Sequence, residues 1–307
     1  SLMLTSILDV APIVMMIGIG VLLRVTGLLG KEGRLALTRI AYYVTIPTAI
    51  TLSIARADIT PELLLLPLLG LVVPIILVGV IYLTTPRLAQ EPRLRGAMMV
   101  CMVGLVVFGY PFAELFYGVD GMARLALYDV GNVLFIATLA LWIAKRYGDS
   151  GEAAVGLQGL TNIFKSPFIY SAALGIAASL LHIEITGPIG RLLEQLAQAN
   201  TPVAMMAVGS YLSLKAARPG RVAQVAAVRM LLGGALAWGL GLLVGLRGLN
   251  LVLATMAASL PVGTTPLIYA GNEGLDAEFA AAAISFTVIL GAILVNVVPH
   301  MMAGLYL

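Results

Sequence analysis

Ten apolar runs, each about as long as a membrane-spanning helix, constrain this 307-residue chain more than any other feature of its sequence. Spanning the hydrocarbon core of a bilayer takes about 20 largely apolar residues in a helix. Hydrophobic residues make up 60% of the chain and charged residues 11%, which is more apolar surface than one water-soluble domain can bury. The runs lie near residues 7–24, 34–55, 62–84, 96–117, 121–144, 167–183, 188–214, 222–246, 249–271 and 276–306. They do not alternate polar and apolar residues as barrel strands do, so the sequence predicts an all-α integral membrane protein of about ten spanning helices.

The basic residues are unevenly distributed among the loops that connect these runs. Twelve follow odd-numbered runs and four follow even-numbered runs: Arg24, Lys31, Arg34, Arg87, Arg93, Arg95, Lys145, Arg146, Lys165, Lys215, Arg218 and Arg221, against Arg56, Arg124, Arg191 and Arg247. Loops rich in Lys and Arg tend to stay in the cytoplasm. The distribution therefore predicts a multi-pass protein of the cell (inner) membrane with both termini on the non-cytoplasmic side. The net charge of +3 is scattered over these loops, which argues against a nucleic-acid partner and for the lipid bilayer.

The two halves of the sequence resemble each other in four features that occur in the same order. Each half has a Gly-Arg-Leu triplet, a segment with threonine shortly before proline (the Thr-Pro segment), a helix interrupted by proline and a Gly-x-Asp triplet. In the first half these are Gly33-Arg34-Leu35, Thr45-Ile46-Pro47-Thr48-Ala49, Pro111 and Gly118-Val119-Asp120. In the second half they are Gly190-Arg191-Leu192, Asn200-Thr201-Pro202-Val203-Ala204, Pro261 and Gly274-Leu275-Asp276. Five helices per unit is an odd number, so the second unit must be inverted relative to the first. We predict a first repeat at 1–146, a cytoplasmic linker at 147–165 and a second repeat at 166–307.

Two glycine- and proline-containing segments occupy matching positions in the two halves. One extends from Gly104 to Pro111 and the other from Ser259 to Pro266. Proline removes a backbone donor and clashes with the preceding turn, while glycine lowers helix propensity. The fourth and ninth helices are therefore expected to be broken and to cross near the bilayer centre. The alternative is that these prolines only kink the helices for packing.

The second parts of both broken helices are expected to start inside the protein. Thr265 suits an N-cap and Pro266 the first helical position, and the fourth helix is expected to restart at Pro111. Free N–H groups at such starts can hold an anion, so a carboxylate is expected to bind between them. The residues expected to line this site are Gly104, Tyr110, Pro111, Pro261, Thr264, Thr265 and Pro266, with Asp129 and Asn132 beside them.

Ionisable residues inside apolar runs are costly in lipid and call for a reason. Asp129 and Asn132 lie about one turn apart in the fifth helix. They are expected to form a proton or cation site or part of the substrate site, unless Asp129 only pairs with a neighbouring helix. Arg229 is a candidate charge partner for Asp129 or for the anion, and its alternative is to reach the cytoplasmic surface with its long side chain.

Enzyme and metal chemistry find no support in the sequence. His-Glu-x-x-His, the Walker lysine loop, Gly-x-Ser-x-Gly and paired intramembrane aspartates are all missing from it. Two distant histidines and the single Cys101 offer no zinc site and no disulfide framework. We therefore expect a protein that is not an enzyme and holds no cofactor, with H⁺ or Na⁺ as the candidate coupling ion.

Several short segments form a recognisable series along the chain. The segment from Ala199 to Leu212 runs through a proline to a Gly-x-x-Leu sequence. The others are Gly109-Tyr110-Pro111, Phe116-Tyr117-Gly118, Tyr128-Asp129-Val130-Gly131-Asn132, Leu260-Pro261 and Gly274-Leu275-Asp276. Together these segments resemble the auxin efflux carrier family in its bacterial branch over nearly the whole chain. This resemblance implies a secondary carrier of small organic anions such as malonate or auxin.

The resemblance also implies an elevator-type carrier with crossed, interrupted fourth and ninth helices. Helices 1, 2, 6 and 7 would form a scaffold that dimerises, and helices 3–5 and 8–10 would form the moving transport domain. Members usually carry an asparagine where this chain has Gly104, so this resemblance does not imply the usual amide contact or substrate here, and water or a different ligand group is expected to fill the gap.

Two other functions remain open from the sequence. A sodium-coupled carrier of the bile-acid type shares this architecture, but its Cys-Pro-Gly-Gly signature is absent from the sequence. A membrane sensor that binds a ligand without transporting it is the alternative from a different class. Sensors of this fold tend to carry an additional signalling domain, and the sequence contains none that we recognise.

Overall fold

The computed structural model describes residues 2–149, 166–212 and 218–302, and this part of the chain consists of helices, connecting turns and one isolated β-bridge. Most of the predicted linker, residues 150–165, lies outside the described residues. Within these described residues, five helical stretches are long and apolar enough to cross a membrane: Lys31–Ala55, Pro61–Thr84, Val106–Tyr147, Pro219–Leu243 and Ala277–Leu294. Shorter apolar helices lie at Val10–Val25, Pro167–Leu180 and Gly248–Ala258. The prediction of an all-α, multi-pass membrane protein is therefore confirmed.

The first half of the chain contains several helices that join end to end. Its elements are α1 (Leu2–Val25), α2 (Lys31–Ile40), η1 (Ala41–Thr45), α3 (Ile46–Ala55), η2 (Pro61–Leu64), α4 (Leu65–Thr84), η3 (Pro86–Gln90), α5 (Pro92–Val100), α6 (Val106–Phe135), η4 (Ile136–Ala140) and α7 (Leu141–Tyr147). A wide π-helical turn, η1, joins α2 to α3, and a second such turn, η4, joins α6 to α7.

The second half follows a similar order. Its elements are α9 (Pro167–Leu180), α10 (Gly187–Gln198), α11 (Asn200–Tyr211), α12 (Pro219–Ala226), η5 (Ala227–Leu232), α13 (Gly233–Leu243), α14 (Gly248–Ala258), α15 (Thr265–Glu273) and α16 (Ala277–Met302). A π-helical turn, η5, again joins two α-helices inside a spanning stretch.

Gly118 and Gly274, the first residues of the recurring Gly-x-Asp triplets, both turn the chain with positive φ angles. Gly118 has φ 61° and ψ −150° and bends α6 sharply, while Gly274 has φ 80° and ends α15 in the left-handed conformation. Glycine adopts these angles without the steric cost that a Cβ atom imposes. The bend at Gly118 divides α6 into two arms, as the separate runs at 96–117 and 121–144 predicted.

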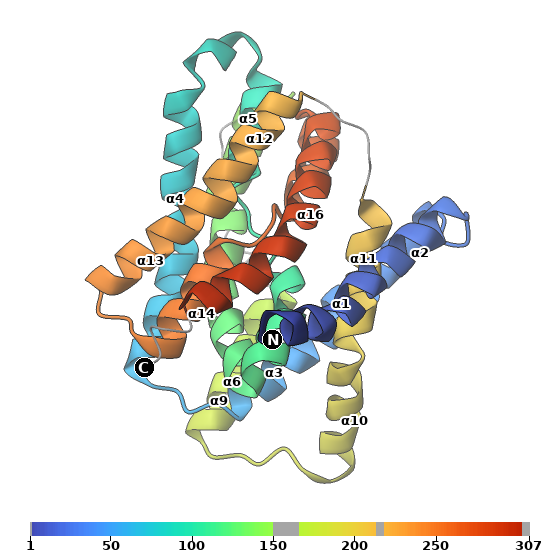
Figure 1. The fold of residues 1–307 in the computed structure, drawn as a ribbon, viewed down its shortest axis with the longest axis vertical. Helices are drawn as coiled ribbons and strands as arrows, with labels where there is room; N and C mark the ends of the chain where they lie inside the picture. Colours follow the sequence, from blue (N-terminus) through green and yellow to red (C-terminus); the bar gives the residue numbers. More distant parts are fainter. Residues whose placement is uncertain (1, 150–165, 213–217, 303–307) are drawn as a thin grey trace.

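The helices pack in two groups. In the first group α1 packs against α11, and α3 packs against α9 and α10. In the second, α4 packs against α6, α13 against α14, and α12 against α16. In Figure 1, α1, α10 and α11 of the first group lie at the right and its α3 and α9 at the bottom, while α4, α12 and α13 of the second group lie at the left. Contacts of α6 with α3, α9 and α11 connect the groups. Many large apolar side chains remain exposed on the outer surface, including Leu83 and Leu243, as expected for a surface that faces lipid.

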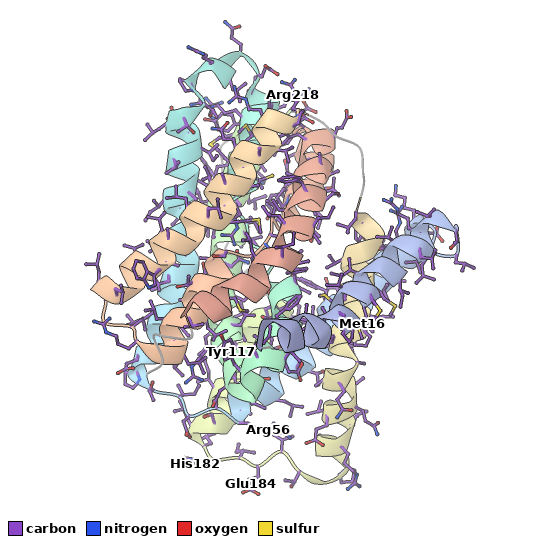
Figure 2. The ribbon with its side chains drawn as sticks, viewed as in Figure 1. Met16, Arg56, Tyr117, His182, Glu184 and Arg218 are labelled. Atoms are coloured by element: carbon purple, nitrogen blue, oxygen red, sulfur yellow. The ribbon has the colours of Figure 1, made fainter. Side chains whose placement is uncertain are left out.

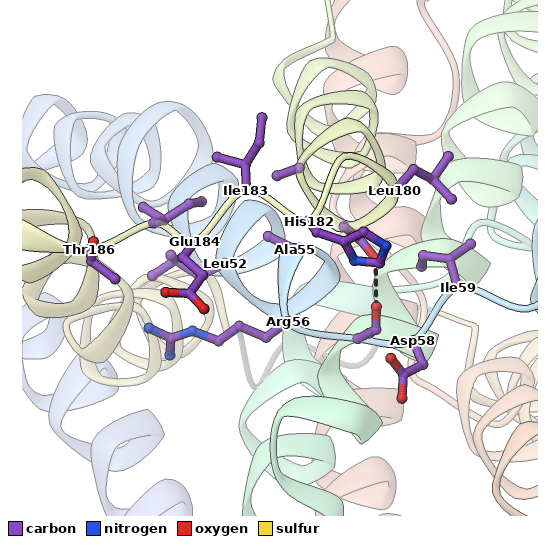
Figure 3. A pocket seen from close by; sticks show the side chains of 14 residues that line it. Leu52, Ala55, Arg56, Asp58, Ile59, Leu180, His182, Ile183, Glu184 and Thr186 are labelled. Atoms are coloured by element: carbon purple, nitrogen blue, oxygen red, sulfur yellow. Dashed lines mark hydrogen bonds between the residues drawn. The ribbon is translucent and has the colours of Figure 1, made fainter.

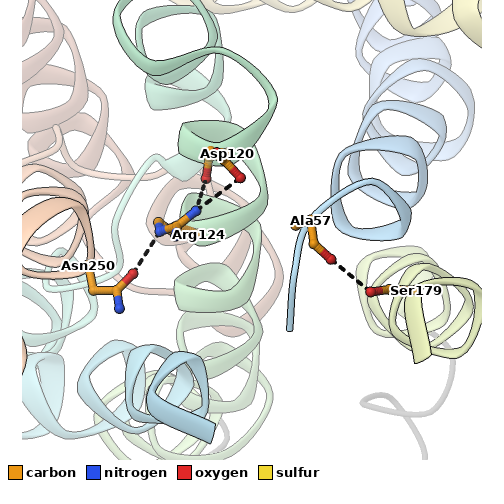
Figure 4. A network of polar contacts seen from close by, with 5 residues as sticks. All are labelled: Ala57, Asp120, Arg124, Ser179 and Asn250. Atoms are coloured by element: carbon orange, nitrogen blue, oxygen red, sulfur yellow. Dashed lines mark hydrogen bonds and ion pairs between the residues drawn. The ribbon is translucent and has the colours of Figure 1, made fainter. Parts of the chain in front are cut away.

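Polar residues mark the two ends of the molecule. Figure 2 shows Arg56, His182 and Glu184 at one end and Arg218 at the opposite end. Arg56 forms an ion pair with Glu194, and Arg218 forms one with Glu91. Figure 4 shows the side chain of Arg124, which bonds Asn250 at 2.7 Å and Asp120 at 3.3 Å and so ties α6 to α14. The Ser179 hydroxyl donates to the Ala57 carbonyl at 2.7 Å beyond the end of α3 (Figure 4).

Close packing between α1 and α11 depends on glycine on both helices. A Cβ atom on Gly20 would collide with the carbonyl oxygen of Met206, and one on Gly209 with that of Ile17. Small residues allow helix backbones to approach in this way in membranes. We expect Gly20→Ala to reduce the free energy of unfolding by about 1–3 kcal/mol, because the two helices must move apart. A lower melting temperature in detergent would show this loss. Gly18→Ala on the same helix faces open space and serves as the control, and equal melting temperatures for the two variants would contradict this packing.

Candidate functional site

The two interrupted segments meet inside the protein and pair through their backbones. Residues 101–105 separate α5 from α6, and residues 259–264 separate α14 from α15. The N–H of Leu105 donates to the carbonyl of Pro261 at 2.8 Å, and the N–H of Gly263 donates to the carbonyl of Val103 at 2.9 Å. These bonds form an antiparallel bridge between Gly104 and Val262. Unpaired peptide groups are costly away from water, so two broken helices satisfy each other here.

The peptide groups of Gly104 and Val262 point outward from this bridge, because the two residues form a pair without hydrogen bonds between them. Asn132 of α6 binds both groups of Gly104: its Oδ1 accepts the N–H at 3.1 Å and its Nδ2 donates to the carbonyl at 3.2 Å. On the other side the hydroxyl of Thr287 in α16 accepts the N–H of Val262 at 3.1 Å. Side chains from two further helices therefore hold the bridge in place.

Thr287 is a functional candidate that the sequence analysis missed. A single threonine in an apolar run carries no local signal. Thr287 follows Gly274 at nearly the same sequence separation as Asn132 follows Gly118. Comparison of the two repeats could therefore have indicated Thr287. Thr287 also donates to the carbonyl of Ala283 at 2.7 Å, which fixes its oxygen toward the bridge.

Asp129 lies in a buried chain of hydrogen bonds that ends at the bridge. The hydroxyl of Tyr110 donates to its Oδ2 at 2.9 Å, and Nδ2 of Asn132 donates to its Oδ1 at 3.0 Å. All three side chains are buried. In the described part of the chain Asp129 has no ion pair, and its two side-chain partners both belong to α6. The structure thus brings Tyr110, Asp129, Asn132 and Gly104 together.

Arg229 lies on the π-helical turn η5 and is 1% exposed, so the interpretation in which it reaches the cytoplasmic surface is wrong. Its Nη1 donates to the carbonyl of Ala258 at 2.9 Å, and its Nη2 lies 3.5 Å from the carbonyl of Ala257. These carbonyls end α14, where the helix dipole attracts a positive charge. No carboxylate pairs with Arg229 among the described residues.

The predicted start of the helix at Pro111 is wrong. The helix α6 begins at Val106, and Pro111 lies inside it. The helix begins where the chain leaves the β-bridge at Leu105, and Pro111 removes only one hydrogen bond one turn further on. The sequence signal of proline therefore marked the region of the break but not its position.

The start of α15 differs from the prediction by one residue. Thr264, not Thr265, is the N-cap residue, and its side chain makes no capping bond. Thr265 and Pro266 are the first two helical residues, and Pro261 is buried in the break itself. A short bonded turn after Thr264, whose carbonyl accepts the N–H of Leu267 at 3.1 Å, replaces the side-chain cap.

Two of the cavities lined by described residues lie between the two groups of helices. A cavity of about 70 Å³ is lined by Leu105, Val107 and Thr264 next to the bridge and by residues of α2 and α11. A cavity of about 330 Å³ lies between α3, α6 and α10 and contains Glu114, Arg56 and Glu194. The first of these cavities reaches the bridge, and the second lies beside α6 near its bend at Gly118.

A third cavity lined by described residues, of about 600 Å³, does not reach the bridge. Figure 3 shows its lining by Arg56, Asp58, His182 and Glu184, where α3 ends and the chain passes from α9 to α10. None of its lining residues belongs to the bridge. Among the described residues no group of three His, Cys, Asp or Glu side chains converges on a metal-sized site.

Comparisons with known proteins point to one family. A model of the membrane transport protein family matches residues 5–299. An uncharacterized transporter of Methanothermobacter thermautotrophicus is 26% identical over 290 residues, which cover 92% of this chain and 94% of that protein. A protein named as a malonate transporter in Rhizobium meliloti is 27% identical over 201 residues, 60% of this chain and 62% of that protein. Auxin efflux carrier component 1 of Arabidopsis thaliana is 28% identical over 151 residues, 47% of this chain and 24% of that protein.

Proposed function

The chain belongs to the membrane transport protein family, which includes the auxin efflux carriers, and we propose that it carries a small organic anion across the bilayer. The proposed substrate is a small carboxylate such as malonate or an auxin-like acid, the molecules after which two relatives are named. The observation that supports this function best is the buried backbone bridge between Gly104 and Val262. Broken helices that expose helix starts inside a membrane protein are the usual construction of a transporter's substrate site.

An elevator-type movement fits the packing of the helices. The proposed scaffold consists of α1, α2, α3, α9, α10 and α11, and the proposed transport domain of α4–α7 and α12–α16. The helices of each group pack mainly on one another, and α6 supplies most contacts between the groups. The cavities of about 70 Å³ and about 330 Å³ both lie between the groups, the first at the start of α6 and the second near its bend at Gly118. Sliding of one group along the other would open the bridge first to one cavity and then to the other.

An inverted repeat is also part of the proposal. The positive φ angles of Gly118 and Gly274, and the matching roles of Asn132 and Thr287 at the bridge, support it. The recurring Thr-Pro segments touch each other, since the Thr45 hydroxyl lies 3.3 Å from Oδ1 of Asn200. A homodimer through the scaffold helices, both termini outside the cytoplasm, and coupling to H⁺ or Na⁺ complete the proposal.

Uptake of labelled malonate into proteoliposomes tests the proposed function. We expect time-dependent uptake that unlabelled malonate and other small carboxylates inhibit, and a higher melting temperature of the purified protein when malonate is present. Empty liposomes, and liposomes with the Asn132→Leu variant, provide the controls. A broad panel of carboxylates that gave neither uptake nor thermal stabilisation would contradict an organic-anion carrier.

The same assay separates the two alternative functions. Uptake and stabilisation that require Na⁺ would favour a sodium-coupled symporter of the bile-acid type. Ligand-dependent stabilisation with no uptake under any gradient of H⁺ or Na⁺ would favour a membrane sensor. Repeating the measurements at two pH values and with and without Na⁺ therefore decides among all three.

A further inference from the structure

The guanidinium of Arg229 is buried but only partly bonded. An arginine has five N–H donors, and among the described residues only the α14 carbonyls of Ala257 and Ala258 accept from this one. Its Nε is buried and has no hydrogen-bond partner. Burying a charged group without a partner is costly, so an arginine in this state needs an occupant for its free edge.

The free edge of this guanidinium lies at the bridge. Nε and Nη2 form one edge of the planar group, and Nη2 occupies the position where a side chain at residue 104 would lie. An ideal Cβ atom on Gly104 would overlap Nη2 and would lie 3.2 Å from Cζ of Arg229. The same Cβ would lie 3.7 Å from Oδ1 of Asn132. Glycine at residue 104 is therefore what allows the guanidinium to reach the bridge.

We propose that Arg229 binds the carboxylate of the transported anion through its Nε–Nη2 edge, and that Gly104 admits it to the site. Arginine presents two parallel N–H groups on one edge, which match the two oxygens of a carboxylate. The assignment rests on the proposed transport of an organic anion and names the group that recognises it. It also predicts selectivity, because a neutral molecule of the same shape offers no charge to the free edge.

The location of Arg229 suits reversible binding of an anion rather than a permanent ion pair inside the protein. The helix end of α14 stabilises the cation when the substrate is absent, and the nearest carboxylate in the hydrogen-bond chain, Asp129, is held by Tyr110 and Asn132. The turn η5 that carries Arg229 is π-helical, a local widening that is frequent at functional sites. An anion can therefore arrive and leave without breaking an internal salt bridge.

Malonate affinity of the full chain in detergent tests this proposal, measured from the rise of melting temperature with malonate concentration. We expect Arg229→Gln to lose malonate stabilisation, and Arg229→Lys and Gly104→Ala each to weaken apparent affinity at least about tenfold. The Gly104→Ala/Arg229→Lys double variant is expected to bind no more weakly than Arg229→Lys alone, because both changes remove the same contact. Gly239→Ala, which faces open space in α13, is the control. Malonamide, the uncharged analogue, is expected not to stabilise the wild-type protein.

Each outcome has a defined meaning. Wild-type malonate affinity retained in Arg229→Lys and Gly104→Ala would overturn the assignment while leaving the proposed transport intact. Stabilisation by malonamide as strong as by malonate would also overturn it. Wild-type protein that binds none of a panel of carboxylates would overturn the proposed function and the assignment together. If Arg229→Gln does not fold, Arg229→Lys and Gly104→Ala decide the question, since both retain the positive charge next to α14.

Discussion

Replacement of Asn132 by leucine is expected to abolish malonate uptake and to lower the melting temperature strongly. The Asn132 amide pairs with both the N–H and the carbonyl of Gly104 and donates to Asp129. Leucine has the same branched shape and a larger volume, so it leaves little room for water to replace these bonds. Each buried polar group that loses its partner costs about 1–3 kcal/mol, and three groups are affected here. Proteoliposome uptake and thermal unfolding in detergent measure the two effects.

Two further variants are expected to have smaller effects than Asn132→Leu and serve as comparisons. Thr287→Val removes one acceptor, that of the Val262 N–H, and is expected to have an intermediate effect on both measurements. Asn250→Leu removes a half-buried amide that accepts from Arg124 outside the bridge, and is expected to change stability little and uptake least. An Asn132→Leu protein as stable and active as Asn250→Leu would show that the bridge does not need its side-chain support.

The helical, membrane-spanning character of the chain could be predicted because it depends on local composition. An apolar run long enough to cross a bilayer has few alternatives to a helix, since every backbone group must be bonded inside the run. The run at 276–306 corresponds to α16, and the runs at 96–117 and 121–144 meet at the bend of Gly118. Hydropathy does not reveal the π-helical turns η1, η4 and η5, because one extra residue per turn leaves the average apolarity unchanged.

The site was harder to predict because its parts are distant in sequence. The glycines and prolines indicated two interruptions, but the break after α5 lies at 101–105, before Pro111, because pairing with residues 259–264 fixes it. Asn132 and Asp129 were found as polar residues in an apolar run. Thr287 was missed, because threonine is common in membrane helices and its partner is a backbone group in another break. The burial of Arg229 depends on the empty space at Gly104, which no local pattern reveals.

Substitution of Asp129 by asparagine is expected to remove the pH dependence of malonate uptake. The charged and titratable groups around this carboxyl are Tyr110 and Tyr128 on α6 itself, Tyr42 on η1, and Arg229 on η5, across Asn132 and Gly104. When Asp129 is ionised, its negative charge opposes binding of an anion at Arg229. Protonation removes that charge, so wild-type uptake is expected to rise as pH falls. Unit charges separated by about two side-chain lengths interact by roughly 1–3 kcal/mol at an effective dielectric constant of about 20, which corresponds to a change in affinity of about fivefold or more.

Asp120→Asn provides the matched control for this pH profile. Asp120 lies on the same helix and pairs with Arg124 at an exposed position, so its loss is expected to leave the pH profile of uptake unchanged. Tyr110→Phe removes one donor to Asp129 without removing its charge, and is expected to shift the pH profile while keeping its slope. Asp129→Asn protein with the same rise of uptake at acidic pH as wild type would place the coupling proton on another group. Wild-type uptake that does not change with pH but requires Na⁺ would assign coupling to sodium. Asp129 would then only support Asn132 at the bridge.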